Sequence, residues 1–414
     1  MNKVIGRVSA AALAAVLLIA LPTTASAQRS AKQAAPSFKF SKPVQALLAQ
    51  AQAAQQAGDA AGALAILRQA DALPRRNADD MYMITMMTLN SAIMLKDNAL
   101  IEQSLEQALA SGRLPQEEEI KFRRNLGAMA LQRNDTAKAI AEFEKLLTIA
   151  PNDTGMMVEV AELQRRQGLN AKAIETLNRA ITIQSAGGQK AEEAWYRRAL
   201  AIAFDAKLPA ETTAASEALV RAYPNATNWR DVLIIFRDSA RLDDQGNLDV
   251  LRLMRQNNAL AGERDFAEYA ETAAIRGLPG EAKAVIDEGI AKGALQANRP
   301  LVRELLASVS PKIATDRASL PGLEREAAAA KTGRLALATA DAHLGYGNFA
   351  KAAELYQMAL RKGGVDAATV NTRLGLALAK TGDRAGAEAA FRAVSGAPRD
   401  QLARFYQIWL EQRA

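Results

Sequence analysis

Few side chains of this sequence could carry out chemistry. His343 is the single histidine among the 414 residues, and cysteine is absent. A metal site with two histidine ligands and a thiol nucleophile are therefore both excluded within one chain. We expect His343 to be structural or to line a groove. The carboxylates scatter along helix surfaces without a convergent pair, so the sequence predicts no catalytic residue, no cofactor, no metal and hence no enzyme.

Five methionines cluster in one stretch, at Met81, Met83, Met86, Met87 and Met94. Spaced thioethers can bind Cu(I), because sulfur of this kind is a soft ligand. The pattern favours another interpretation. Three of the five share one face of a helix, where methionine is an adaptable filler between packed helices.

Basic residues beside aromatic ones are the strongest candidates for binding. Arginine next to an exposed aromatic ring suits a carboxylate or an extended peptide, through paired hydrogen bonds and stacking. The predicted partner-binding residues are Lys121, Arg124, Trp195, Arg197, Arg198, Trp229 and Arg230.

These residues lie in a sequence that is helical almost throughout from Val44 onward, rich in alanine, leucine, glutamine and arginine. A recurring pair of turn residues divides it into helices. The first residue of the pair can adopt the left-handed conformation that ends a helix, and the second can cap the next helix. The pairs are Gly58-Asp59, Asn134-Asp135, Gly347-Asn348 and Gly382-Asp383.

Small residues recur on both sides of these turns. The first set is Ala51, Gly127, Ala161, Ala270, Ala340 and Gly375, and the second, about twelve positions later, is Ala63, Ala139, Ala173, Ala282, Ala352 and Ala387. Two antiparallel helices approach most closely where neither carries a bulky side chain. The pattern therefore predicts helical hairpins that cross at these positions.

One segment has Leu126-Gly127, Ala139, Phe143 and Pro151, and another has Leu374-Gly375, Ala387, Phe391 and Pro398. In order and spacing these residues resemble the tetratricopeptide repeat, a helical hairpin of about 34 residues. The resemblance implies an all-α, right-handed α-solenoid with a concave groove and a C-terminal capping helix. It also implies that ligands lie against the first helix of each repeat.

The first 27 residues have the pattern of an export signal. Lys3 and Arg7 precede an apolar run, and Ala25-Ser26-Ala27 offers small residues at the cleavage positions. We expect export by the Sec route, cleavage after Ala27, a periplasmic location and no later transmembrane segment. The absence of cysteine excludes disulfides and a lipid anchor on cysteine.

The formal charge of +7 comes from 52 basic and 45 acidic residues, interspersed along the chain. Such a mixed surface argues against nucleic acid as a partner and permits a mild preference for anionic ones, such as acidic peptide or glycan.

The predicted organisation is a signal peptide at 1–27, a linker at 28–43, a first set of repeats at 44–296, an irregular stretch at 297–332, and two further repeats with a capping helix at 333–414. The irregular stretch is alanine-rich and lacks the turn pattern. It is either a helical pair or a junction.

Together these features predict a periplasmic scaffold that binds a protein or peptide partner of the cell envelope in its groove. An alternative is a protein that binds cell-wall or exported polysaccharide, which would need Trp195, Tyr196 and Trp229 as an aromatic platform. A glycan hydrolase would need two carboxylates about 5–10 Å apart in a cleft.

Overall fold

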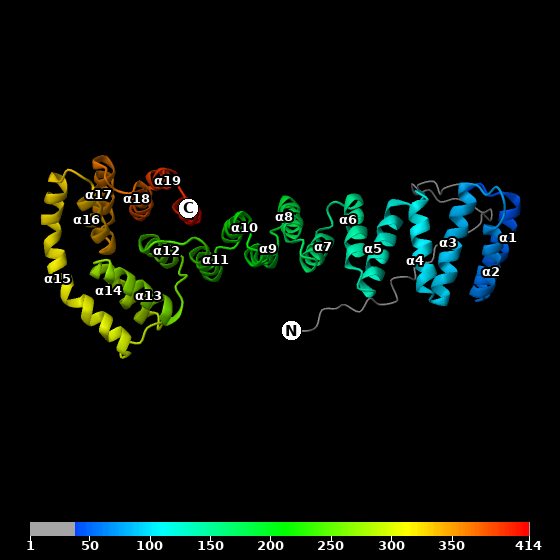
Figure 1. Ribbon diagram of the computed structural model, residues 1–414, viewed down its shortest axis with the longest axis horizontal. Coiled ribbons are helices and arrows are strands. Elements are labelled where there is room, and N and C mark those ends of the chain that lie inside the picture. The colour runs from blue at the N-terminus through cyan, green and yellow to red at the C-terminus, as the bar shows by residue number, and fades with distance from the viewer. Residues whose placement is uncertain (1–37, 414) are drawn as a thin grey trace, which may run out of the picture. The chain divides into compact units, whose positions relative to one another are not determined.

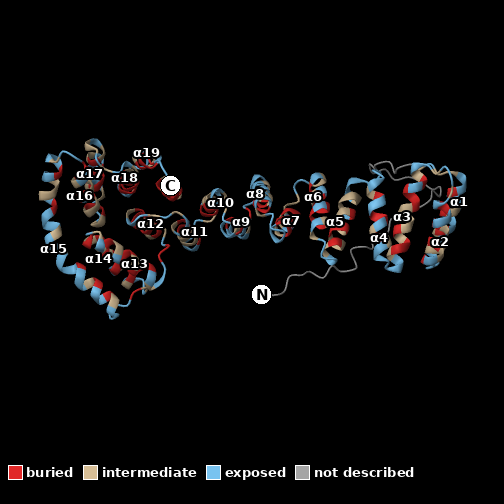
Figure 2. Cartoon of the chain, viewed as in Figure 1, coloured by how far each residue is buried: buried red, intermediate tan, exposed pale blue. Residues whose placement is uncertain are grey.

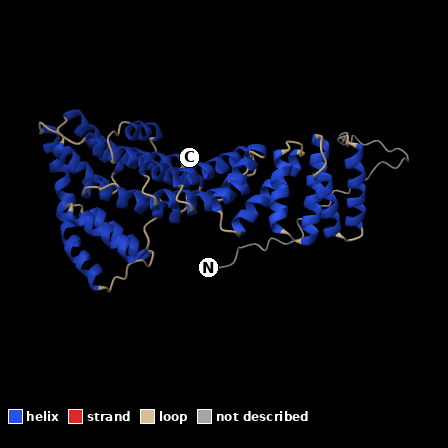
Figure 3. Ribbon diagram, turned by 45° about the vertical axis from the view of Figure 1, so that its right-hand side comes forward, coloured by secondary structure: helices blue, strands red, loops and turns tan. Residues whose placement is uncertain are grey.

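The computed structural model describes residues 38–413 (Figure 1). The predicted signal peptide and most of the predicted linker lie outside the described residues. Within 38–413 every regular element is a helix, as Figure 3 shows, and the predicted all-α class is confirmed.

The described chain divides into two compact units, one ending at Leu169 and the other beginning at Asn170. In the first unit, consecutive helices pack against one another as stacked hairpins. Its helices are α1 (Lys42–Gln56), α2 (Ala60–Asp71), α3 (Ala78–Leu95), α4 (Asn98–Ala110), α5 (Gln116–Gln132), α6 (Thr136–Ile149) and α7 (Thr154–Arg166).

The second unit is also built of stacked helices, with two departures described below. Its helices are α8 (Asn170–Ala186), α9 (Glu193–Asp205), α10 (Pro209–Ala222), α11 (Ala226–Ser239), α12 (Asp244–Gln256), α13 (Gly262–Ile275), α14 (Pro279–Ala291), α15 (Pro300–Ala329), α16 (Arg334–Gly345), α17 (Phe349–Lys362), α18 (Ala367–Thr381), α19 (Arg384–Arg392) and α20 (Arg399–Glu411).

The turns between paired helices follow the predicted chemistry, with one exception. Gly58 and Gly382 have positive φ angles of 81° and 87°, a conformation that glycine adopts without steric cost. Asp59 then accepts a hydrogen bond from the amide of Gly62 at 2.7 Å, which caps α2. Asn348 was predicted to cap in the same way, but its side chain bonds to His343 instead, so this prediction is wrong.

The small residues lie where two helices of a hairpin cross, and all six members of the second set are buried. The close approach is clearest at Gly127 in α5. A Cβ atom added there would lie 2.2 Å from Cε1 of Phe143, which α6 places against it. The buried aromatic ring thus occupies the space that a side chain at 127 would need.

Buried residues lie at contacts between helices throughout the described part of the chain. Figure 2 shows the buried residues on the helix faces that meet neighbouring helices, with exposed residues on the opposite faces. Met83 belongs to the core that α1, α2 and α3 share, and Met87 packs against that core. These methionines therefore fill space between helices, as their pattern favoured.

Residues 300–329 form one long helix, α15, that contains Pro311 and Pro321. It packs on α13 and α14 at its start and on α16 further along the chain (Figure 1).

Helix α20 is the second departure from simple stacking. It covers α18 and α19, as expected of a terminal cap, and it also packs against α10 and α12. Arg404 donates to Glu217 of α10 at 2.9 Å, and the ring of Tyr406 stacks on Phe391 of α19. The C-terminal helix thereby joins α10 and α12 to α18 and α19.

No helix among residues 38–413 combines the length and the apolar character needed to cross a membrane.

Candidate functional site

Two of the predicted binding residues lie on α5 in the first unit, and both are exposed. Lys121 donates to Glu118 at 2.8 Å, and Arg124 donates to Asp153 at 3.0 Å. The hydrogen bond to Glu118 raises the pKa of Lys121. Surface ion pairs contribute little to stability, so a carboxylate of a partner can replace them at little cost.

The other five lie in the second unit. Arg197 on α9 is exposed and donates to Asn228 and Asp231 of α11, the latter at 2.8 Å. Trp195 is half-buried and Arg198 is exposed. Arg230 donates to the buried carboxylate of Asp265 at 3.0 Å, so it helps to join α11 to α13.

The prediction that Trp229 is an exposed aromatic residue is wrong. The side chain is 1% exposed. Its ring lies edge-on to Phe405, and its Nε1 donates to Gln412 at 3.2 Å. Helix α20, distant in sequence, covers it. Tyr196 is buried as well. Of the three rings that a sugar-binding platform would need, Trp195 alone keeps part of its surface exposed.

His343 lies on α16 and is buried. Its Nε2 is 3.0 Å from Oε1 of Glu324 on α15, and its Nδ1 is 3.3 Å from Nδ2 of Asn348. The imidazole therefore connects α15 to the turn that follows α16.

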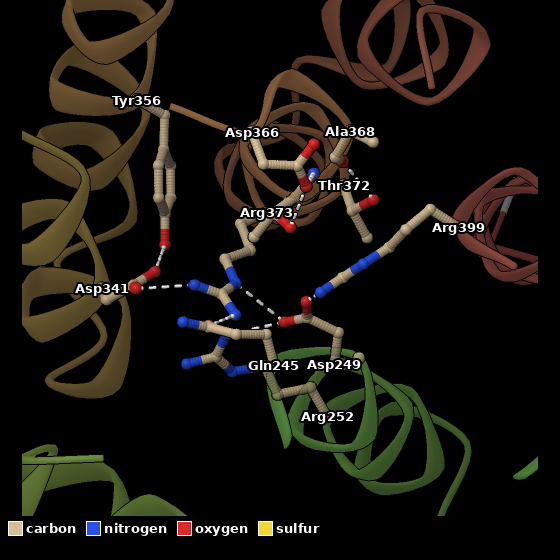
Figure 4. A network of polar contacts seen from close by, with 12 residues as sticks. Gln245, Asp249, Arg252, Asp341, Tyr356, Asp366, Ala368, Thr372, Arg373 and Arg399 are labelled. Carbon is tan, nitrogen blue, oxygen red and sulfur yellow. Dashed lines mark hydrogen bonds and ion pairs between the residues drawn. The ribbon is translucent and has the colours of Figure 1, made fainter. Parts of the chain in front are cut away.

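A network of ion pairs, most of them buried, joins helices of the second unit in a place that no sequence motif indicated (Figure 4). Asp249 of α12 is its hub. One carboxylate oxygen accepts from Arg252 and from Arg373 of α18, each at 2.9 Å, and the other accepts from Arg399 of α20. Three helices thus meet on one carboxylate.

The remaining members of the network balance its charge. Glu281 of α14 accepts two hydrogen bonds from Arg252, at 2.8 and 2.6 Å, and Asp341 of α16 accepts one from Arg373 at 2.6 Å. Three arginines therefore face three carboxylates. We call these six residues, Asp249, Arg252, Glu281, Asp341, Arg373 and Arg399, the ionic core.

The arginines of the ionic core favour the charged forms of Asp249 and Glu281. Burial by itself would raise the pKa of Asp249, but the charges of Arg373, Arg252 and Arg399 hold that pKa well below its usual range. Burial likewise opposes ionisation of Glu281, and Arg252 nevertheless lowers its pKa. Because three positive and three negative charges face one another, the ionic core joins helices.

A cavity of ≈ 480 Å³ lies next to the ionic core. Its buried floor is formed by Arg252, Tyr269 and Glu281, and the exposed Lys380 and Arg413 stand at its mouth. Its half-buried wall is formed by Arg255, Gln256, Ala284, Glu288, Gly345, Tyr346 and Phe349. Four cationic side chains and two carboxylates line the cavity, so its lining carries an excess of positive charge.

This cavity includes none of the predicted binding residues. Its walls come from α12, α13, α14, α16, α17 and α18, from the turn between α16 and α17, and from Arg413 after α20. The local sequence around each lining cation resembles that of an ordinary surface residue. The cavity can be recognised only in the folded second unit, which brings residues as far apart in sequence as Arg252 and Arg413 together.

Comparison with known proteins gives one family match and several distant structural likenesses. A family model described as a tetratricopeptide repeat matches residues 125–153, which span the end of α5 and all of α6. This match confirms a tetratricopeptide repeat at residues 125–153, where the sequence pattern predicted one. No curated protein matches the chain.

Among solved structures, the MamA protein is 13% identical over 48% of this chain and 95% of its own, with a TM-score of 0.28. A tetratricopeptide repeat protein from Parabacteroides merdae is 10% identical over 71% and 99%, with a TM-score of 0.25. PilF of Pseudomonas aeruginosa is 16% identical over 72% and 98%, with a TM-score of 0.20. At these TM-scores the likenesses carry no argument about function.

Proposed function

We propose that this tetratricopeptide-repeat protein is an exported scaffold that holds a protein partner of the bacterial cell envelope and does no chemistry of its own. Repeats of this family bind protein partners. The finer statements, export and an envelope partner, rest on the leader pattern at 1–27.

The observation that carries the proposal is the exposed cationic face of α5, the first helix of the repeat that matches the family model. Lys121 and Arg124 lie one turn apart on it and face solvent, while Phe122 and Leu126 of the same helix are buried. The core therefore fixes the backbone of α5, so that only the two exposed side chains lose freedom on binding. Such preorganisation lowers the entropic cost of binding an acidic segment.

Crosslinking in living cells tests this proposal directly. A photoreactive amino acid is placed at position 121 on α5, or at position 145 on α6 as the matched control. Lys121 and Lys145 are both exposed lysines that pair with a glutamate three residues earlier. We expect position 121 to capture a defined envelope protein, identified by mass spectrometry, and position 145 not to capture it.

Charge reversal adds an independent measurement. The double substitution Lys121→Glu and Arg124→Glu should reduce capture from a nearby position on α5, whereas Lys145→Glu should leave it unchanged. Circular dichroism checks that both variants keep their helix content. Equal capture by all three chains, or capture from position 145 only, would contradict the proposed surface.

A further inference from the structure

The floor of the cavity in the second unit is electrostatically complete. Arg252 is held by Glu281 and Asp249, and Tyr269 donates to Glu281 at 2.7 Å. In the wall, Glu288 accepts from Arg255 at 2.6 Å and from Lys292 at 2.8 Å. The carboxylates that line the cavity are therefore all engaged by cations or by a hydroxyl group.

The cations at the mouth differ from those of the floor. Lys380 donates to the neutral amide of Gln256 at 3.0 Å and lies 5.6 Å from the ring centroid of Phe349. The guanidinium of Arg413 lies 5.0 Å from the ring centroid of Trp409. Among residues 38–413, no carboxylate forms an ion pair with either cation.

The surroundings of Lys380 show the consequence of this excess charge. Partial burial of its amine, together with the charges of Arg413 and Arg255, holds the pKa of Lys380 below its usual value. A negative charge placed between these cations would relieve the repulsion among them.

Another part of the lining is apolar. Tyr346 donates to Asp316 at 2.5 Å, and its ring lies so close to Gly280 that a Cβ atom there would be 2.1 Å from it. Leu344, Leu376 and Phe349 also line the cavity. Its fixed ring and aliphatic side chains suit a flat or branched apolar group.

We propose that this cavity binds a small organic anion, with its acidic head between Lys380 and Arg413 and its apolar body against Tyr346 and Phe349. The cavity volume lies in the range of ligand pockets. The acidic head is the carboxylate of a free organic acid or the terminal carboxylate of a peptide, and the two have the same chemistry. This site does not depend on the envelope partner proposed above.

Isothermal titration calorimetry of the purified full chain tests the proposal with 3-phenylpropionate as the probe. Its uncharged counterpart, 3-phenylpropionamide, has the same shape without the charge. We expect one binding site for the acid and at least about tenfold weaker binding of the amide, since a charge-assisted hydrogen bond is lost. Binding of the acid should weaken as salt is added.

Substitutions assign the site. Lys380→Met and Arg413→Gln should each weaken binding of the acid by about tenfold. Lys312→Met, at an exposed lysine of α15 outside the cavity, is the matched control and should bind like the wild type. Because all three side chains are exposed, we expect unchanged thermal midpoints. Equal affinity of acid and amide, absence of binding at millimolar acid, or equal affinity of all variants would overturn the proposal.

A second pair of probes identifies the source of the acid. The tetrapeptide Ala-Ala-Ala-Phe is compared with its C-terminal amide. Tighter binding of the peptide acid than of 3-phenylpropionate assigns the site to a peptide terminus, and weaker binding assigns it to a free organic acid. Inorganic phosphate binding as tightly as 3-phenylpropionate would overturn the role of the apolar wall.

Discussion

At the scale of single residues, the size of one side chain sets how closely two helices approach. The two repeats in which the large residue is phenylalanine, Phe143 and Phe391, both have glycine opposite it. At Gly375, as at Gly127, an added Cβ atom would lie within 2.4 Å of the ring. In these two repeats the glycine leaves the space that the buried phenylalanine ring fills, as expected of a close-packed interior.

Gly127→Ala should accordingly destabilise the chain by about 1–3 kcal/mol, because the ring of Phe143 must move. Gly155→Ala is the matched control, since a Cβ atom added at this helical glycine would lie 3.6 Å from its nearest neighbour, Oδ1 of Asp153. It should be neutral or slightly stabilising. Urea unfolding followed by circular dichroism measures both. Adding Phe143→Leu to Gly127→Ala should recover part of the loss, and a double variant that recovers nothing would contradict steric conflict as the cause.

The lowered pKa of Glu102 allows a prediction of how the stability of the first unit changes with pH. Hydrogen bonds from Arg133 and Lys138 lower its pKa from 4.5 to about 2. Because the folded-state pKa is depressed, the ionised carboxylate stabilises the fold above pH 4.5, and this contribution disappears as the pH falls towards 2. Glu102→Gln should cost about 1 kcal/mol at neutral pH and flatten the acid-side slope. Urea titrations across this pH range measure that slope, and an unchanged slope would refute the assignment.

At the scale of helices, the ionic core determines how the second unit closes. Asp249→Asn keeps the shape of the side chain and removes its charge, which leaves three buried arginines facing two carboxylates. Breaking a buried pair in this way costs about 3–5 kcal/mol. Asp244→Asn, an exposed position on the same helix, is the control.

Tryptophan fluorescence reports the second unit selectively, because Trp195, Trp229 and Trp409 all lie in it. We expect the urea midpoint of the fluorescence transition to fall for Asp249→Asn and to stay in place for Asp244→Asn. Equal midpoints for the two variants would show that α12, α18 and α20 are held together without the charge of Asp249.

The helices also show how far sequence reasoning extends. The hairpins were predictable because each depends on residues fewer than 35 positions apart, such as Gly127 and Phe143. The burial of Trp229 was not predictable, since Phe405 and Gln412 cover it from the far end of the chain. The cavity escaped prediction for the same reason. Lys380 meets Gln256 across 124 positions, and helical periodicity contains no information on such contacts.

The capping of Asn348 shows a subtler limit. Its turn has the same sequence pattern as the other turns, yet its amide bonds to His343 rather than to the backbone of α17. A neighbouring side chain can compete for a capping residue, and that competition depends on where the imidazole lies. The local sequence pattern predicts the position of the turn correctly, but it does not predict the hydrogen-bond partner of the Asn348 side chain.

At the scale of the whole molecule, the proposed role depends on where the chain functions. A scaffold for envelope partners must leave the cytoplasm, and the leader at 1–27 provides the route in the proposal. Signal peptidase requires small residues at the last and third-last positions of the leader, which Ala27 and Ala25 supply.

Expression of the full chain in a Gram-negative host should therefore yield a periplasmic protein that begins at Gln28, as measured by intact-mass analysis of the cell fractions. Ala27→Leu should block cleavage and leave the precursor at the membrane, because the larger side chain does not fit the peptidase. Ala31→Leu introduces the same side chain beyond the cleavage position and should be processed normally. A cytoplasmic chain that keeps its first 27 residues would remove the envelope partner from the proposal, whereas the anion-binding cavity would still require its own test.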